Sequence, residues 1–520
     1  MSHSAIELPS VNALIVSALQ QFPDRVAFAQ GDRTITYRQA ADLTARLVAA
    51  LKVRGVGPGR VVGILAANGP EAWLTQSAVQ LLGGITVGLH AKASIEDHAY
   101  VCRDAGLALL VTDEKFAEPA AMAVTAAGVD VPLAVLGASP DHPDLLAEAG
   151  TQSGGRLVAG PTRSCDLVEI LYTGGTTGRS KGVMQTHRAR SAITLLAPMA
   201  YELPLAPVYL ACSPITHAAA HFVLPTLLRG GTVVLTDGFD PDEFATTVQR
   251  RRVNLTFAVP SMIYKLLDHL GDGVELPSLQ RLVYGASPMS GSRLAEGHAR
   301  FGDVFTQIYG QTETLALGTV LRSDEHDFTD PARLASCGRV VPGMSLALLD
   351  DDGRQVPDGE MGEICLRGPG VMAGYLGQPD VTAEALAGGW LHTGDMARAD
   401  DQGYLTIVDR KKDFIISGGF NVYSREVEDI LTAHPAVATA AVVGVPDPVW
   451  GEAVKAVIVL RSGHHVDTDE LAAAVRAAKG PVATPKSFDV VDDLPVTALG
   501  KTDKKILRAR YWRDRDRAVN

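Results

Sequence analysis

Cysteine is scarce in this sequence, and the few cysteines lie far apart. The 520 residues contain five of them, an odd number with no C-x-x-C pair. This distribution fits neither a disulfide framework nor a zinc site, and it indicates reduced thiols. The sequence also lacks any apolar run approaching about 18 residues, and the apolar stretch after Val11 has neither a preceding Lys or Arg nor a cleavage signature. We therefore expect no membrane span and a cytoplasmic location.

Positive charge is in the minority. The chain has 47 Lys and Arg against 59 Asp and Glu, which gives a formal net charge of −12. Nucleic acids and anionic membranes require concentrated positive potential, so neither is expected as the main partner, although a local basic site stays open. Hydrophobic residues make up 46% of the chain and charged residues 20%, as in a globular protein with a sizeable core. At about 100–200 residues per domain, the length fits two or three domains.

Strand and helix patterns alternate through most of the first half of the chain. An apolar run at 61–66 precedes a helical pattern, and an apolar run at 208–212 precedes one at 218–228. The next helix is predicted to begin at Pro241, with Asp240 as its N-cap. This alternation predicts the α/β class, with largely parallel sheets covered by helices.

The pattern changes twice in the second half. From about Ser345, short alternating runs broken by turn residues predict a small antiparallel β layer. A charged cluster at 409–413 then precedes a small α+β unit. Its predicted elements are helices at 424–433 and 469–478 and strands at 437–445, 454–460 and 488–491. We place a domain boundary near residue 410, which gives an N-terminal domain of residues 1–410 and a C-terminal domain of residues 411–520.

A segment rich in glycine and threonine follows the strand predicted at 167–171. Its glycines let successive backbone N–H groups converge on an anion, its threonine hydroxyls add donors, and Lys181 supplies a positive charge. The segment therefore predicts a phosphate cradle. It is not a Walker A loop, because no Gly stands at the required distance before a Gly-Lys-Ser/Thr. The cradle residues are Thr173, Gly174, Gly175, Thr176, Thr177, Gly178 and Lys181.

Several segments in a fixed order resemble motifs of the adenylate-forming family, which includes acyl- and aryl-CoA synthetases, firefly-type luciferases and peptide synthetase adenylation domains. The segments are residues 172–182, 309–313, 392–395, 409–413 with 418–428, and 495–501. The resemblance covers nearly the whole chain and is strongest to bacterial fatty and aryl acyl-CoA synthetases. It implies ATP, Mg²⁺ and coenzyme A as cofactors and a small carboxylic acid as substrate.

The resemblance also implies roles for individual residues. Glu313 offers the hard carboxylate that Mg²⁺ prefers, and Tyr309 can stack on adenine. Asp395 at a turn can accept hydrogen bonds from both ribose hydroxyls. The implied catalytic residues are Lys501, Glu313, Thr176 and His217, and the implied nucleotide-binding residues beside the cradle are Tyr309, Gly310, Gln311, Thr312, Asp395 and Arg410.

The family further implies that the C-terminal domain rotates between two half-reactions. Lys412 corresponds to the pivot, since hinges are a few residues that absorb a large backbone change. Gly418 and Gly419 are expected to line a narrow tunnel for the pantetheine arm of coenzyme A. Trp450 resembles the tryptophan on the coenzyme A side, although a partly buried core aromatic is the plain alternative.

The resemblance further implies an acid pocket beside His217. His217 and His221 are four residues apart, yet no third metal ligand is evident, so a metal site is not expected there. Residues 213–218 contain no acid that could hold a substrate ammonium group, which argues against amino acids. Residues 285–289 lack the last glycine of a hydrolase G-x-S-x-G elbow. The expected pocket residues are His217, His221, Phe222, Gly285, Ala286 and Ser287, with Gly310 beside them.

These features predict an ATP-dependent acid–CoA ligase that forms an acyl-adenylate and then a thioester with coenzyme A. The acid is expected to be fatty, alicyclic or aromatic. Two alternatives stay open: a ligase that loads the acid onto a carrier protein, and a member that performs only the thiolation of a preformed adenylate. The second alternative draws on the altered phosphate loop, with Gly174 where the family commonly has Ser and Ser180 where it commonly has Pro. The hinge segment also departs from the family pattern, with Ser424 where Pro is common. A homodimer is possible, and no nucleic-acid partner is expected.

Overall fold

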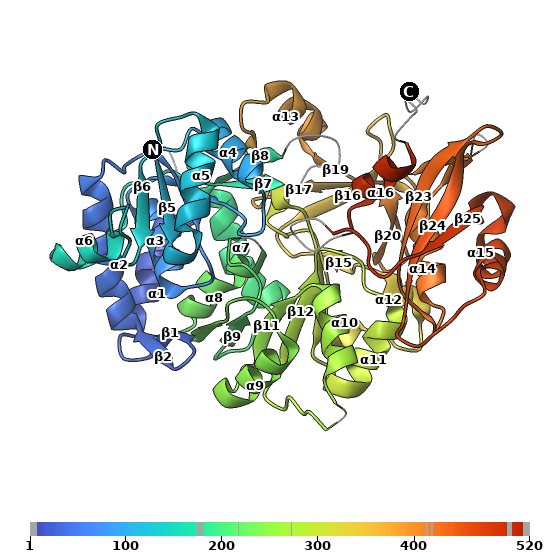
Figure 1. The fold of residues 1–520 in the computed structure, drawn as a ribbon, viewed down its shortest axis with the longest axis horizontal. Coiled ribbons are helices and arrows are strands. Elements are labelled where there is room, and N and C mark those ends of the chain that lie inside the picture. The colour runs from blue at the N-terminus through green and yellow to red at the C-terminus, as the bar shows by residue number, and fades with distance from the viewer. Residues whose placement is uncertain are drawn as a thin grey trace, which may run out of the picture.

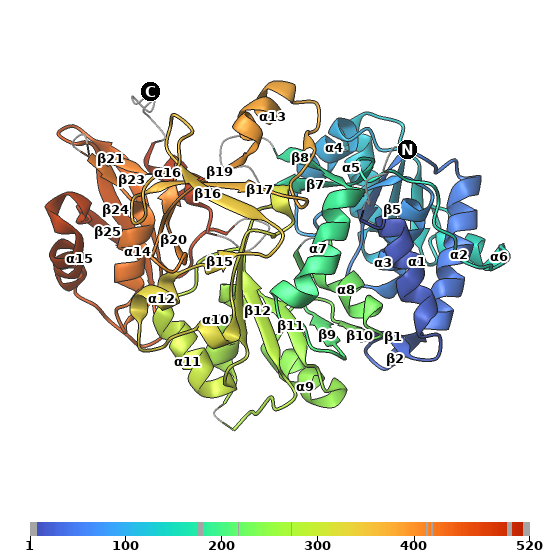
Figure 2. The same cartoon turned by 180° about the vertical axis from the view of Figure 1, so that it is seen from behind.

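The computed structural model describes residues 8–173, 180–216, 218–271, 273–411, 414–417, 420–496 and 502–512 (Figure 1). Two large sheets with helices make up the N-terminal part, and a small β layer lies between them and the C-terminal unit (Figures 1 and 2). This arrangement confirms the predicted fold class. Two parallel-type sheets are present where the sequence pattern alone did not separate them.

The first sheet has seven strands in the order β18-β8-β7-β4-β3-β5-β6. Its inner pairs are parallel, whereas β7 pairs antiparallel with β8, and β8 with β18. The strands are β3 (Val61–Leu65), β4 (Ile85–Gly88), β5 (Leu109–Asp113), β6 (Leu133–Leu136), β7 (Leu167–Thr173), β8 (Lys181–Thr186) and β18 (Gly374–Tyr375). The helices along this part are α2 (Tyr37–Val53), α3 (Pro70–Leu81), α4 (Ile95–Asp104), α5 (Ala117–Ala127) and α6 (Leu145–Thr151).

The second sheet has nine strands in the order β15-β14-β13-β12-β11-β9-β10-β1-β2. Its central strands are parallel. The strands are β1 (Val26–Gln30), β2 (Arg33–Thr36), β9 (Val208–Ala211), β10 (Thr232–Leu235), β11 (Leu255–Ala258), β12 (Arg281–Gly285), β13 (Phe305–Tyr309), β14 (Thr319–Leu321) and β15 (Arg339–Val340). The helices along it are α1 (Val11–Gln21), α7 (His187–Ala200), α8 (Val223–Leu228), α9 (Pro241–Arg251), α10 (Pro260–His269), α11 (Gly291–Phe301) and α12 (Pro331–Ala335).

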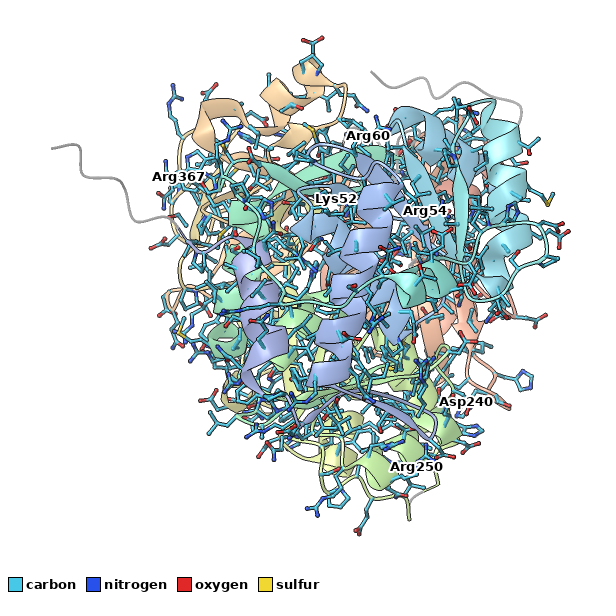
Figure 3. The ribbon with its side chains drawn as sticks, turned by 90° about the vertical axis from the view of Figure 1, so that its left-hand side faces the viewer. Lys52, Arg54, Arg60, Asp240, Arg250 and Arg367 are labelled. Carbon is cyan, nitrogen blue, oxygen red and sulfur yellow. The ribbon has the colours of Figure 1, made fainter. Side chains whose placement is uncertain are left out.

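Helix α9 shows why these elements begin and end where they do. Asp240 caps it as predicted, with its carboxylate accepting from the backbone N–H groups of Asp242 and Glu243, both at 3.0 Å. Near its other end, Arg250 pairs with Asp32 in the β1–β2 turn (3.0 Å) and so ties the helix to the edge of the sheet. Asp240 and Arg250 are both seen at the surface in Figure 3.

The small β layer is antiparallel, as expected, with strand order β16-β17-β19-β20. Its strands are β16 (Ser345–Leu349), β17 (Gly362–Arg367), β19 (Leu391–Ala399) and β20 (Leu405–Arg410), with α13 (Pro379–Ala385) before β19.

The C-terminal unit is a sheet with strand order β22-β21-β24-β23, and β25 pairs with β24. It buries its own core of aliphatic residues, including Val427, Leu431 and Val475. Its elements are β21 (Ile415–Ser417), β22 (Phe420–Val422), α14 (Ser424–Thr432), β23 (Val437–Asp447), β24 (Gly451–Leu460), α15 (Thr468–Ala483), β25 (Ser487–Val490) and α16 (Lys504–Tyr511). A core of its own is what a separate folding unit requires.

Two predicted helices differ from their expected form. The segment predicted as a helix at 218–228 begins as a 3₁₀ turn over Ala218–Phe222 and becomes α-helical only at Val223. Helix α15 continues past its predicted end at residue 478 to Ala483, across a kink at Gly480 with φ of 80°. In the part of the chain that the structure describes, no helix is long and apolar enough to cross a membrane.

Candidate active site

Several predicted site residues meet at the carboxyl ends of neighbouring parallel strands. Strand β12 ends at Gly285 and β13 at Tyr309, and Gly285 pairs with Ile308 in the register of these two strands. A Cβ atom on Gly285 would lie 2.3 Å from the carbonyl oxygen of Ile308, so this position admits only glycine. The carboxyl edge of a parallel sheet is where α/β proteins place ligands.

The segment after β13 forms a tight loop. A Cβ atom on Gly310 would lie 2.6 Å from the Cα of Ala316, and Ala316 itself has φ of 65°. Gln185 on β8 donates to the carbonyl of Thr312 at 2.7 Å and thereby fastens this loop to the first sheet. The loop therefore holds Thr312 and Glu313 at the junction of the two large sheets.

Asp395 lies at the centre of a hydrogen-bonded group that we name the Asp395 cluster: Tyr309, Gln311, Asp395 and Arg410. Its Oδ2 accepts from the hydroxyl of Tyr309 (2.7 Å) and from Nε2 of Gln311 (2.8 Å), and its Oδ1 accepts from Nε of Arg410 (3.2 Å). Asp395 is only 5% exposed. Burial, followed by the Asp395 charge, raises the pKa of Tyr309 well above its usual value, so this phenol stays a donor. The structure thus brings together four residues from three of the predicted motifs.

Glu313 lies in a second group, the Glu313 cluster: Lys181, Glu313 and Tyr375. The hydroxyl of Tyr375 donates to Oε1 of Glu313 at 2.8 Å, and Nζ of Lys181 lies 4.6 Å from the centre of the Tyr375 ring. Burial, followed by the charge of Glu313, raises the pKa of Tyr375. Among the described residues, Oε2 of Glu313 receives no hydrogen bond, so this hard oxygen fits a divalent cation such as Mg²⁺.

Tyr375 was missed by the sequence reasoning. It lies on the two-residue strand β18, which pairs with β8 and so lies beside Lys181. The aromatic residue itself is the available signal, yet its pairing partner lies almost 200 residues earlier in the chain. Thr173, the last residue of β7, pairs with Lys181, the first residue of β8, so these two predicted cradle residues lie side by side.

The predicted acid pocket is described in part. Nη1 of Arg190 lies 2.5 Å from Nδ1 of His221, and Nε of Arg190 lies 3.8 Å from Glu169, which makes a buried charged group. Phe222 is 1% exposed and stacks on Phe257 with centroids 5.6 Å apart, so it lies in an aromatic core. Among the described residues, His221 belongs to no group of metal-ligating side chains.

The last two pocket residues follow β12 directly. Ala286 has φ of 67° and is exposed, and Ser287 is half-buried.

The C-terminal side of the predicted site is described at two places. Trp450 is 39% exposed, and Nζ of Lys486 lies 5.4 Å from the centre of its ring. The carboxylate of Asp409 on β20 accepts from the backbone N–H and the hydroxyl of Ser424 (2.6 and 3.1 Å). The remaining predicted residues lie outside the described residues: Gly174, Gly175, Thr176, Thr177, Gly178, His217, Lys412, Gly418, Gly419 and Lys501.

Comparison with known proteins identifies the family. Residues 16–376 match the AMP-binding enzyme family, and residues 426–501 match the AMP-binding enzyme C-terminal domain. A medium/long-chain-fatty-acid–CoA ligase, FadD8 of Mycobacterium tuberculosis, is 42% identical over 97% of this chain and 91% of its own length. A feruloyl-CoA synthase of Amycolatopsis is 36% identical over 94% of this chain and 96% of its own.

Solved structures show the same fold. The amide bond synthetase McbA of Marinactinospora thermotolerans superposes with a TM-score of 0.89 at 34% identity, covering 96% of this chain and 99% of its own. The predicted enzyme class, an AMP-forming acid–CoA ligase, is confirmed by the relatives. The chain belongs to the AMP-binding family of adenylate-forming enzymes.

Proposed function

We propose that the Asp395 and Glu313 clusters together form the ATP site of a two-step ligase. In the first step a carboxylate oxygen of the acid attacks the α-phosphorus of ATP, and the bond to pyrophosphate breaks. In the second step the thiol of coenzyme A loses its proton and attacks the acyl carbon, and AMP leaves. The observation that carries the proposal is the buried carboxylate of Asp395, which accepts three hydrogen bonds, one of them from Tyr309. Glu313 lies on the loop that follows Tyr309.

The two clusters suit different parts of the nucleotide. Asp395 presents acceptor oxygens for ribose hydroxyls, and the ring of Tyr309 at the end of β13 suits adenine. Lys181 and Thr312 suit the phosphates. Mg²⁺ bound to Glu313 would neutralise part of the phosphate charge. The positive Lys181 would add to this effect, because positive groups placed at the phosphates stabilise the transition state of phosphoryl transfer.

The acceptor is proposed to be free coenzyme A. The exposed ring of Trp450 beside Lys486 offers an aromatic face and a positive charge, which suits a nucleotide carrying phosphates. Gly418 and Gly419 stay the predicted tunnel residues, and residues 411–520 the predicted mobile domain that pivots at Lys412. We keep transfer to a carrier protein and thiolation alone as the alternatives that the experiment must separate.

Ser424 supports a hinge at the proposed domain boundary. Its N–H and hydroxyl both bind Asp409, and Nζ of Lys504 donates to its hydroxyl at 2.8 Å. A proline in this position could not donate its backbone N–H. The last residues of β20 are therefore joined to the C-terminal unit by hydrogen bonds that the proposed rotation has to break, and Ser424 gives Asp409 two donors that a proline lacks.

The acid is proposed to be fatty, alicyclic or aromatic, without an amino group. Relatives named for a fatty acid and for ferulate support this range. The proposed lining of the acid pocket stays as predicted: His217, His221, Phe222, Gly285, Ala286 and Ser287. Arg190 holds the ring of His221, and the side chain of Phe222 is buried in the core. A cytoplasmic location is proposed because the buried cysteines are free thiols. A homodimer stays a prediction.

The deciding experiment follows both half-reactions in purified protein. Pyrophosphate release and thioester formation are measured with ATP, coenzyme A and a panel of fatty, alicyclic and aromatic acids. We expect both products with at least one acid. Pyrophosphate release without a coenzyme A thioester would favour a carrier acceptor, and a thioester formed only from synthetic acyl-AMP would favour thiolation alone.

Lys501→Ala tests the division of labour between the half-reactions. We expect adenylate formation to fall by about 10²–10³-fold, because a positively charged group at the reacting oxygens is lost. Thioester formation from preformed acyl-AMP should change by less than about threefold, because this step does not use the lysine. An equal loss in both steps would contradict the two-conformation proposal.

A further inference from the structure

A buried carboxylate lies beside the Asp395 cluster and has no role in the mechanism above. Glu363 on β17 is 5% exposed. In the register of β17 and β19, Glu363 pairs with Met396 and Cys365 pairs with His392, so residues 393–395 bulge out opposite the single residue Ile364. A β-bulge re-aims the side chains that it carries, and here it carries Asp395.

Glu363 uses both carboxylate oxygens to hold this bulge. Oε1 accepts from the backbone N–H of Gly394 at 2.9 Å. Oε2 accepts from Nδ1 of His392 at 3.1 Å and from Nζ of Lys411 at 3.3 Å. Burial alone would raise the pKa of Glu363, but these bonds and the Lys411 charge outweigh it and hold the pKa below its usual value.

The carbonyl of Gly394, in the next peptide unit, is also fixed. The carbonyl of Gly394 accepts from the backbone N–H of Lys411 at 2.7 Å, and Gly394 has φ of 73°, which favours glycine. The hydroxyl of Thr393 donates to the carbonyl of Ile364 and accepts from the N–H of Asp395 (2.7 and 3.1 Å). Contacts outside the Asp395 cluster therefore help to set the direction of the Asp395 side chain, beside the three hydrogen bonds of the cluster itself.

A metal centre is the competing explanation for this group. Glu363, Cys365 and His392 have ligand atoms within 4.8 Å of one another. However, Lys411 already places its ammonium group on Oε2 of Glu363, and it also pairs with Asp351 at 2.7 Å. Burial, followed by the charge of Glu363, raises the pKa of Cys365 to about 12, so its thiol is neutral at physiological pH. The group is complete as a hydrogen-bonded network without a cation.

We propose that Glu363 is a positioning residue for ribose recognition: by fixing Gly394 and His392 it aims the carboxylate of Asp395, and through Lys411 it joins that carboxylate to the end of β20. The inference rests on the proposed function of Asp395. Under this proposal, Glu363 on β17 contributes to nucleotide selectivity although it does not touch the nucleotide.

The test compares affinities for ATP and 2′-deoxyATP, measured by calorimetry with purified protein in the absence of acid. Glu363→Gln keeps one acceptor for Gly394 but sets an amide against Lys411 and His392. We expect its Kd for ATP to rise about tenfold and its Kd for 2′-deoxyATP to rise about twofold, because ATP offers Asp395 two ribose hydroxyls and 2′-deoxyATP offers only one. The preference for ATP should therefore shrink about fivefold.

A matched control and a conservative variant make the outcome decisive. Glu360→Gln, exposed in the turn before β17, should leave both affinities within twofold. Glu363→Asp keeps the charge with a shorter reach and should restore part of the preference; it also serves if the Gln variant does not fold. A Glu363→Gln preference equal to that of the wild type overturns the inference. Wild-type protein that binds no ATP contradicts the proposed function instead.

Discussion

The two halves of the proposed nucleotide site differ in how completely the protein fills them. In the Asp395 cluster, three side chains donate to one buried carboxylate, and Glu363 behind it has three donors of its own. In the Glu313 cluster, the described residues offer the side-chain carboxylate of Glu313 one donor, the hydroxyl of Tyr375. The carboxylates of the Asp395 half are thus held by several protein donors each. The carboxylate of Glu313 has more acceptor sites left for a ligand.

This difference matches the ligands proposed for each half. Ribose hydroxyls are neutral and weakly held, so selectivity needs an acceptor whose position is already fixed before binding. A magnesium triphosphate brings its own strong charges and can order flexible side chains around it. The comparison teaches that preorganisation is concentrated where the ligand contributes least.

The largest effect is expected at the Glu313 half. Glu313→Gln removes the hard carboxylate proposed for Mg²⁺, and we expect the rate of pyrophosphate release to fall by about 10²–10³-fold. Excess Mg²⁺ should recover part of the loss. Glu384→Gln, exposed on α13, is the control and should keep the wild-type rate. A Glu313→Gln rate within threefold of wild type would remove Glu313 from the mechanism and with it this half of the comparison.

The Asp395 half should respond in affinity more than in rate. Asp395→Asn leaves an amide nitrogen facing the Tyr309 hydroxyl and the Gln311 amide, and it loses one acceptor for ribose. We expect KM for ATP to rise about 10–100-fold, with a smaller change in kcat. Steady-state kinetics with varied ATP measures both. The control, Asp401→Asn in the exposed turn after β19, should leave KM unchanged, and an unchanged KM in Asp395→Asn would exclude ribose binding there.

Much of the fold followed from local sequence patterns. The cap at Asp240 and the helix after it were predictable because an N-cap and a proline act within one turn of the chain. The apolar runs at 61–66 and 208–212 likewise form the strands β3 and β9. The split into two sheets was not predictable, because it depends on which strands pair, and pairing partners such as β1 and β10 lie far apart in the chain.

The site shows the same limit. Asp395, Glu313 and Tyr309 carry motif signals and were predicted as site residues. Tyr375 and Glu363 were not, because one lies on a two-residue strand and the other acts through a bulge in its neighbour. Residues that support a site through the backbone have no spacing rule in the sequence.

A smaller effect is expected from Tyr375. Tyr375→Phe removes the one described donor to Glu313 but keeps the ring beside Lys181. We expect the Mg²⁺ concentration for half-maximal pyrophosphate release to rise about 2–10-fold, because one neutral donor is lost. Tyr404→Phe removes a similar hydroxyl from Glu325 and should leave the Mg²⁺ requirement unchanged. An equal shift in both variants would attribute the effect to general loosening of the fold.

The smallest expected effect concerns stability and reads the Glu363 network directly. The pKa of Glu363 is held below its usual value in the folded protein, so its contribution to stability is present above the pKa of an unfolded glutamate, about 4.5, and is lost as pH falls through the folded value. Glu363→Gln has no such titration. The difference in unfolding free energy between wild type and Glu363→Gln should thus be about 1 kcal/mol at neutral pH and shrink below about pH 4.5.

Urea unfolding from pH 7 down to the lowest pH at which both proteins fold measures this difference. Glu360→Gln, which removes an exposed carboxylate from the same hairpin, should track the wild type throughout. A difference between wild type and Glu363→Gln that stays constant with pH would mean that the charge of Glu363 adds nothing in the folded protein. The position of Asp395 would then depend on the geometry of the bulge alone. The two halves of the site would differ in backbone geometry and not in electrostatics.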